Sequence, residues 1–281
     1  MPRLESTKRL LRRWFTSLPF FVVLGLILGA AIAIPVIPRP GIATIRISGS
    51  IMGQAYADEI LGILRDVRDD DSIKAVVLQI DSPGGEASII EQIYLDLLRL
   101  RGEKPVVACI GARGASGGYY IAVASNYIYA QPTSQLGNVG AWVSLPSPEE
   151  LDEDTLATGL FKATGGSKRR AVAKLEMVRQ EFVSAVISQR GDRLEMSDEE
   201  LSLAELYSGV ESLRHGLIDD IGTVTAATRK AASLAGIRNY EVVKPYISGP
   251  VLGFWGFSGM EELRSQTNLM PIYYYLCFES E

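Results

Sequence analysis

The sequence predicts an α/β fold, and three observations support this class. From about residue 41 onwards, short runs of aliphatic residues alternate with longer amphipathic segments, which is the pattern of strands followed by helices. The 281 residues are 47% hydrophobic and 22% charged, which is enough apolar material for one domain with a complete core. We find no internal repeat and no low-complexity tract. We therefore expect a single α/β domain over residues 41–243.

The elements of this domain follow from hydrophobic periodicity. Strands are expected where aliphatic residues alternate or run continuously, at 42–47, 75–80, 105–110, 127–130 and 160–164. Helices are expected where apolar residues recur every three or four positions, at 56–69, 88–101 and 172–190, near Leu203, and at 223–235. A further helix of small residues is expected directly after Ser116.

The N-terminal region predicts a membrane anchor. Five basic residues and one acidic residue lie in the flank 1–13, and no charged residue stands between Arg13 and Arg39. An apolar segment of this length, assigned to 14–38, suits an uncleaved transmembrane helix better than a cleaved signal peptide. Because basic flanks stay in the cytoplasm, we expect a single-pass protein of the cell membrane with its folded domain on the extracytoplasmic side.

Charge and cysteine content exclude several classes of function. The net charge is −5, and removing the basic flank leaves an acidic body with a charge of −9, which argues against a nucleic-acid partner. Cys109 and Cys277 match no metal-ligand spacing, so we expect no metal and no cofactor. Cys109 lies in a predicted buried strand and is expected to be a core residue, although a bridge to Cys277 stays open.

Three loops carry residues with a chemical use. The loop 81–85 (Asp-Ser-Pro-Gly-Gly) follows a predicted strand, and its paired glycines allow close approach of backbone N–H groups to a ligand. The loop 114–119 (Gly-Ala-Ser-Gly-Gly-Tyr) places Ser116 at a helix N-terminus, where it is either a nucleophile or an N-cap. The loop 164–170 (Thr-Gly-Gly-Ser-Lys-Arg-Arg) contains Lys168, which is either a general base or a solvated surface residue.

A serine nucleophile needs a base. The chain has one histidine, His215, at a predicted helix end, where it suits the last helical carbonyls. Lysine is the known substitute, because burial lowers the pKa of a lysine until its neutral amine accepts the serine proton. The hypothesis from the residues is therefore a nucleophilic Ser116 activated by Lys168.

These loops, in this order, resemble the signal peptide peptidase A family (peptidase family S49), whose members are serine proteases with a Ser-Lys dyad. The resemblance runs from about Ile42 to Val243 and includes, besides the three loops, 207–209 (Tyr-Ser-Gly) and 216–222 (Gly-Leu-Ile-Asp-Asp-Ile-Gly). It implies that Ser116 attacks the scissile carbonyl, that Lys168 accepts its proton, and that the N–H groups of Gly85 and Gly117 form the oxyanion hole. Relatives orient the lysine with a serine; here Asn138 takes that place and can accept the same hydrogen bond.

The resemblance also implies a fold and a setting. The family has the spiral of ββα units shared with the Clp protease and the crotonases. Short members with one copy of the domain form homo-oligomeric rings in which serine and lysine come from neighbouring subunits. Their substrates are cleaved signal peptides and other apolar peptides left at the membrane, and we expect such chains to bind by β-strand addition.

Alternatives remain at this stage. A Clp-type Ser-His-Asp protease needs a histidine soon after the nucleophile's helix, and 132–136 contains none. A Ser-Lys membrane protease acting on stomatin-like proteins, a crotonase-like acyl-CoA enzyme and a catalytically silent membrane scaffold share parts of the pattern. The aromatic-rich tail 244–281 is expected to pack on the domain or a neighbouring subunit, or to lie against the membrane or the active-site groove.

Overall fold

The computed structural model describes residues 18–36, 39–145, 158–159, 161–162, 165–244 and 273–277. The chain divides into two compact units, Met1–Arg39 and Pro40–Glu281. The first unit contains the helix α2 (Leu18–Val36), in which no residue is charged. Within the described residues, no helix is both long enough and apolar enough to cross a membrane.

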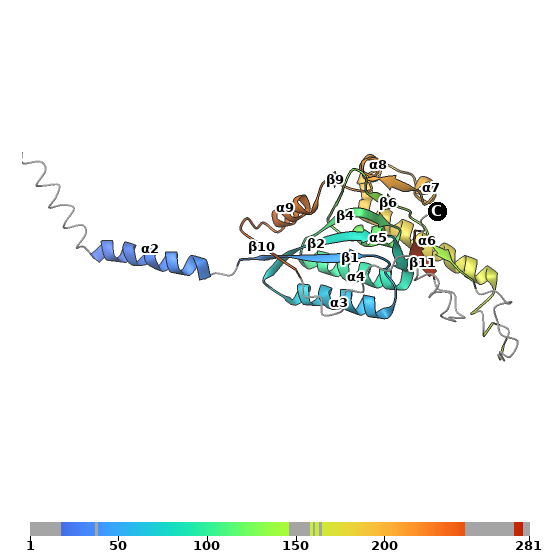
Figure 1. The fold of residues 1–281 in the computed structure, drawn as a ribbon, viewed down its shortest axis with the longest axis horizontal. Helices are drawn as coiled ribbons and strands as arrows, with labels where there is room; N and C mark the ends of the chain where they lie inside the picture. Colours follow the sequence, from blue (N-terminus) through green and yellow to red (C-terminus); the bar gives the residue numbers. More distant parts are fainter. Residues whose placement is uncertain are drawn as a thin grey trace, which may run out of the picture. The chain divides into compact units, whose positions relative to one another are not determined.

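The second unit is built on one largely parallel sheet (Figure 1). Its strands run in the spatial order β10-β1-β2-β4-β5-β9, with β6 beside β4 and β8 beside β6. Only the pair β6 and β8 is antiparallel. Their bounds are β1 Gly41–Ser48, β2 Ile73–Ser82, β4 Val106–Ala115, β5 Tyr127–Ala130, β6 Gln135–Gly137, β8 Leu206–Ser208, β9 Asp220–Ile221 and β10 Glu241–Val243.

The sheet is covered on both faces, because its central strands send apolar side chains in both directions. Along β2, Val76 and Leu78 enter the main core, whereas Ala75 and Val77 enter a second, smaller core. This alternation of two buried faces is typical of parallel sheets. Figure 1 shows α3 and α4 on one side of the sheet and α9 on the other.

The helices supply the complementary apolar faces. The main core contains side chains of α3 (Gln54–Asp69), α4 (Ala87–Glu103), α5 (Gly117–Ala122) and α6 (Lys168–Arg190). The smaller core is closed by α9 (Val224–Leu234) through three alanines. Two shorter helices, α7 (Asp198–Leu201) and α8 (Gly209–Arg214), both start with a Ser/Glu capping box, and η2 (Gly191–Arg193) follows α6.

A small second sheet lies beside the main one. It consists of β3 (Gly84–Glu86), β11 (Tyr273–Leu276) and β7 (Trp142–Val143), with β11 in the middle and antiparallel to both neighbours. The central strand therefore comes from the C-terminal end of the chain and joins two segments more than 120 residues away. This sheet was not predicted.

The α/β class and the order of the main elements agree with the sequence prediction. Four expectations need correction or stay open. The helix predicted from residue 172 begins at Lys168, and the helix predicted near Leu203 ends at Leu201. Of the predicted strand 160–164, residues 161–162 form a turn and the rest lies outside the described residues. The tail 244–281 contains a strand, β11, and most of its other residues also lie outside the described part.

Candidate active site

Ser116 occupies a strained turn between β4 and α5. Its backbone has φ 51° and ψ −121°, a region that serine rarely adopts and that costs on the order of 1–3 kcal/mol. The turn is held by a 2.8 Å hydrogen bond from the Ser116 N–H to the Gly137 carbonyl. The residue is 1% exposed. It stands at the N-cap position of α5, yet its hydroxyl makes no capping hydrogen bond. The N-cap interpretation therefore does not account for this serine.

The glycine loop 81–85, which spans the end of β2 and the start of β3, lies against the Ser116 turn. Ser82 is fully buried, and its hydroxyl donates to the Gly49 carbonyl (2.7 Å) and accepts from the Gly84 N–H (3.1 Å). Gly84 has φ 102°, and a Cβ atom on it would lie 2.7 Å from the Gly117 nitrogen. Two glycine-containing loops predicted to work together are thus in direct contact, and the absence of side chains is what permits this approach.

Gly85 and Gly117, the predicted oxyanion-hole residues, are both tightly enclosed. A Cβ atom on Gly85 would overlap the Ile51 carbonyl, and one on Gly117 would overlap the Ile90 side chain. Gly85 is paired with Tyr275 in the small sheet. Gly85 therefore requires glycine for steric reasons, because its obstacle is backbone, whereas a side chain at Gly117 would require the buried Ile90 side chain to move.

Lys168 is the first residue of α6, and Ser167 caps this helix by accepting a 3.2 Å hydrogen bond from the Arg170 N–H. The Lys168 side chain is exposed in the single chain. Across the part of the chain that is described, no hydrogen bond joins Lys168 to Ser116. One copy of the chain thus supplies the lysine at a defined helix start but does not provide the burial that the lysine hypothesis requires.

Asn138 follows β6 directly, next to the residue that fixes Ser116. Its backbone has φ 52°, which asparagine tolerates better than most residues. Its N–H donates to the Glu205 carbonyl, and its side-chain Nδ2 donates to the Ala204 carbonyl, both at 2.7 Å. The side chain is therefore oriented by its amide nitrogen, and no described residue donates a hydrogen bond to its Oδ1 oxygen.

His215 has a structural place at the C-cap of α8. Its ring lies 4.9 Å from the ring of Tyr207, and its backbone carbonyl accepts from the Glu195 N–H. Among the residues that the structure describes, it forms no hydrogen bond with Ser116. This agrees with the expectation of a histidine at a helix end.

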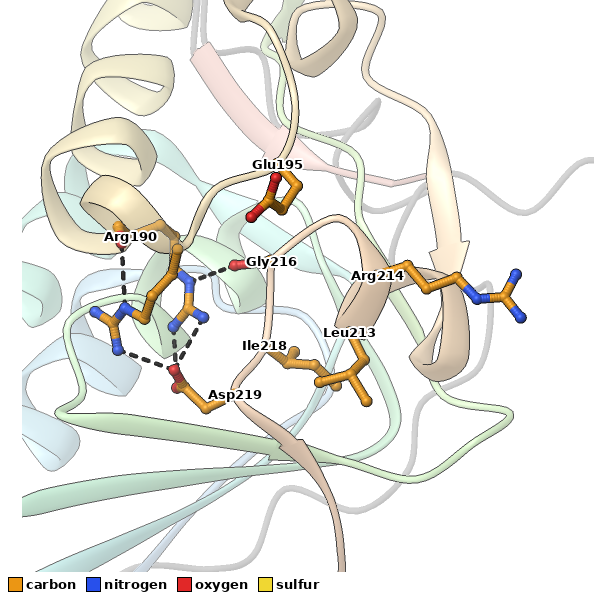
Figure 2. A pocket seen from close by; sticks show the side chains of 8 residues that line it. Arg190, Glu195, Leu213, Arg214, Gly216, Ile218 and Asp219 are labelled. Carbon is orange, nitrogen blue, oxygen red and sulfur yellow. Dashed lines mark hydrogen bonds and ion pairs between the residues drawn. The ribbon is translucent and has the colours of Figure 1, made fainter.

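The motif 216–222 organises a buried ion pair (Figure 2). Asp219, whose side chain is 6% exposed, receives both Nη atoms of Arg190 at 3.0 Å and Nη1 of Arg193 at 2.9 Å. The Arg190 Nε atom donates to the Gly216 carbonyl at 2.7 Å.

The same motif is also linked to the segment after Ser116. Tyr119, three residues after Ser116, donates from its hydroxyl to the Leu217 carbonyl at 2.7 Å. The pocket of about 500 Å³ beside this cluster does not include Ser116 or Lys168.

The C-terminal strand β11 lies beside the glycine loop, in line with the alternative that places the tail against the active-site groove, but its strand structure and its partners were not predicted. It pairs Tyr275 with Gly85 and Leu276 with Gly84, and Cys277 continues the contact by donating a 2.9 Å hydrogen bond to the Pro83 carbonyl. The only signal in the sequence is the run of three tyrosines, which has high β-propensity but does not identify a partner strand.

A strained, buried serine beside two contacting glycine loops is an arrangement typical of serine hydrolases. Comparison with known proteins identifies the particular family of serine hydrolases. Residues 99–238 match the model of peptidase family S49. The chain belongs to this family of serine peptidases, the family of signal peptide peptidase A.

Individual proteins similar to this chain are also named as peptidases, in agreement with the family match. The chain is 28% identical to Protease 4 of Salmonella typhi over 221 residues, which is 72% of this chain and 36% of that protein. It is 29% identical to a putative protease of Methanocaldococcus jannaschii over 198 residues (66% of this chain and 63% of the relative). It is 25% identical to a putative signal peptide peptidase of Enterococcus faecium over 173 residues (57% and 50%). The chain thus spans about a third of the length of Protease 4.

Proposed function

We propose that this chain is a serine endopeptidase in which Ser116 is the nucleophile and Lys168 is the general base. The observation that carries the proposal is the conformation of Ser116: a buried serine in a strained turn whose hydroxyl is not used for capping. Strain of this kind persists only where the surrounding structure enforces it, and it is concentrated at functional sites.

The proposed reaction is acyl transfer to Ser116. Its Oγ atom attacks the scissile carbonyl carbon while its proton passes to the Lys168 amine, which then delivers it to the leaving amine. The N–H groups of Gly85 and Gly117 stabilise the oxyanion. Water then hydrolyses the acyl-enzyme and regenerates the serine. In this scheme the Oδ1 atom of Asn138 accepts a hydrogen bond from the lysine, a role that its fixed Nδ2 supports.

We further propose that the dyad is completed between subunits of a homo-oligomeric ring. The exposed Lys168 at the start of α6 supports this, because a neighbouring subunit would bury it. A ClpP/crotonase-like spiral is the corresponding fold proposal, and the succession of β2, β3 and α4 as one ββα unit supports it.

Membrane anchoring and the substrate class are also proposals. The predicted anchor 14–38 is free of charge in the sequence, and apolar side chains such as Phe21, Leu26 and Ile27 are exposed on α2. A bilayer would bury them, and the basic flank would keep the N-terminus in the cytoplasm. An extracytoplasmic site held at the membrane would act on remnant signal peptides and other apolar peptides.

Carbonate extraction of membranes tests the proposed anchor. The full chain should stay in the membrane pellet, and its release into the supernatant would contradict the anchor.

The test of the function is hydrolysis of fluorogenic apolar peptides by the full chain in detergent. Ser116→Ala and Lys168→Met should each lower kcat/KM by on the order of a thousandfold or more, whereas His215→Ala should leave it unchanged. Retained hydrolysis in Lys168→Met, or its loss in a folded His215→Ala protein, would contradict the proposed dyad.

The shared site has its own test. Ser116→Ala and Lys168→Met chains, each inactive alone, should recover activity when they are co-expressed and purified as mixed oligomers, because some sites then combine an intact serine with an intact lysine. If both residues belong to one subunit, every site in the mixture lacks one of them and activity stays absent.

A further inference from the structure

Strand β4 contains a bulge directly before the Ser116 turn. In the pairing of β4 with β2, Ile110 lies opposite Ile80. The next pair along the two strands joins Gly114 to Ser82. Three residues of β4 therefore stand opposite one residue of β2, so β4 has two extra residues at this point. Bulges bend a strand and are common beside active sites, where they redirect a side chain.

At the bulge, β4 also changes its neighbour on the side away from β2. Residues 107–110 pair with β5, whereas residues 113–115 pair with β6. The last residue of β6, Gly137, accepts the 2.8 Å hydrogen bond from the Ser116 N–H. The end of β4, β6 and the Ser116 turn are thus joined to one another, and the bulge sets their position relative to the rest of the sheet.

Asp81 is the single residue of β2 that lies opposite the bulge. Its backbone carbonyl accepts a 3.0 Å hydrogen bond from the Gly49 N–H, directly after β1. Its Oδ1 atom accepts a 3.0 Å hydrogen bond from the Arg113 N–H. A Cβ atom on Gly111 would lie 3.7 Å from the Asp81 Cγ atom, so the carboxylate lies against the bulge. This exposed carboxylate therefore gives a backbone N–H of the bulge the acceptor that a regular ladder supplies from its backbone.

Ser134 holds the bulge from the side of β6. It is 1% exposed and directly precedes β6. Its hydroxyl donates to the Gly111 carbonyl, within the bulge, and accepts a 2.9 Å hydrogen bond from the Gln131 N–H. One hydroxyl thus joins the bulge to the turn that leads into β6. Because this hydroxyl is buried, its removal would leave both backbone groups without this partner.

We propose that Asp81 and Ser134 are positioning residues of the peptidase, which hold the β4 bulge so that Ser116 keeps its place beside the glycine loop. Neither has a part in the proposed proton transfer. Attack on a carbonyl depends steeply on placement, because an error of about 1 Å in the reacting groups costs on the order of a hundredfold in rate. The inference rests on the proposed function, and one of its two readouts does not require hydrolysis.

The first readout is hydrolysis of the fluorogenic peptides by full-chain variants in detergent. Asp81→Ala should lower kcat about 10–100-fold, because Ser116 is displaced, and change KM less than about twofold. Asp81→Asn keeps an oxygen that accepts from the Arg113 N–H, so its kcat should stay within about threefold of the wild-type value. Ser134→Ala removes the second support and should lower kcat in the same way as Asp81→Ala.

The matched control is Asp70→Ala. Asp70 precedes the start of β2, at the opposite end of this strand from the glycine loop. Like Asp81, it is exposed and its Oδ1 atom accepts a hydrogen bond from a backbone N–H, that of Ser72 at 2.8 Å. Asp70→Ala should therefore remove a comparable hydrogen bond and leave kcat unchanged.

The second readout is amide hydrogen exchange followed by mass spectrometry. In Asp81→Ala and Ser134→Ala, residues 111–117 should exchange about tenfold faster or more, while β1 and all segments of Asp81→Asn keep wild-type rates. Wild-type kcat or wild-type exchange in Asp81→Ala would overturn the inference, as would an equal loss of kcat in Asp81→Asn. Absence of hydrolysis in the wild type, with the exchange results intact, would instead overturn the proposed function.

Discussion

The guanidinium of Arg190 forms a two-pronged ion pair with Asp219, with both Nη···O distances at 3.0 Å. The side chains are 2% and 6% exposed. Asp219 also accepts a 2.7 Å hydrogen bond from the Ile128 N–H, so the last turn of α6 is fixed to β5. The helix that begins with Lys168 is thus anchored at its far end by a buried charge pair.

Breaking this pair should destabilise the domain strongly. Asp219→Ala leaves Arg190 buried without a counter-charge, which typically costs about 3–5 kcal/mol. Urea unfolding followed by circular dichroism measures the change. The matched control is Asp96→Ala, which removes a surface pair with Arg99 (3.1 Å) and should cost less than about 1 kcal/mol. Similar losses in both variants would contradict the structural role of the buried pair.

Gly117 should not tolerate a methyl group. In Gly117→Ala the new Cβ would overlap the buried Ile90 side chain, so we expect a loss of about 1–3 kcal/mol together with lower peptidase activity. Gly62→Ala is the control: no heavy atom lies within 4 Å of its Cβ position in α3, and the change should stabilise by about 0.5–1 kcal/mol. An unperturbed Gly117→Ala protein would show that the glycine contact around Ser116 is looser than described.

The sequence predicted the main sheet better than the site's surroundings, for physical reasons. Strands such as β2 and β4 carry runs of aliphatic residues that are buried on both faces, so composition alone identifies them. Short strands of two to four residues, such as β7 and β11, have no periodicity to read. Their formation depends on partners far away in the chain.

The start of α6 also could not be predicted from hydrophobic periodicity. Apolar periodicity begins only after the first turn, because residues 168–170 are all basic, and the helix was therefore predicted to start four residues late. The N-cap Ser167 was the available signal. In the proposed oligomer, burial of Lys168 would come from a neighbouring subunit, which no pattern within one chain reveals.

Asn138 is expected to act through the oxygen of its side chain. Asn138→Gly keeps a residue that accepts φ 52° but removes the oxygen, so it should lower kcat about 10–100-fold with KM little changed. A change in stability alone, with kcat unaltered, would assign Asn138 only to the contact with Ala204.

Cys109 should weaken the fold at alkaline pH. Burial raises the pKa of its thiol from 9.0 to about 11. Below pH 9 the thiol is protonated in both states and contributes nothing; between pH 9 and 11 the unfolded state loses its proton first, so stability falls. Cys109→Ala should therefore lose less stability than the wild type over this window, by on the order of 1–2 kcal/mol. Parallel stability curves from pH 8 to 11 would contradict this.

The most direct test of the central claim is labelling with a fluorophosphonate, which reacts with activated serines. Mass spectrometry of the labelled full chain should find the adduct on Ser116, and the labelling rate should fall at least a hundredfold in Lys168→Met but stay unchanged in His215→Ala. Labelling of another serine, or an equal rate in Lys168→Met, would contradict a nucleophilic Ser116 activated by Lys168.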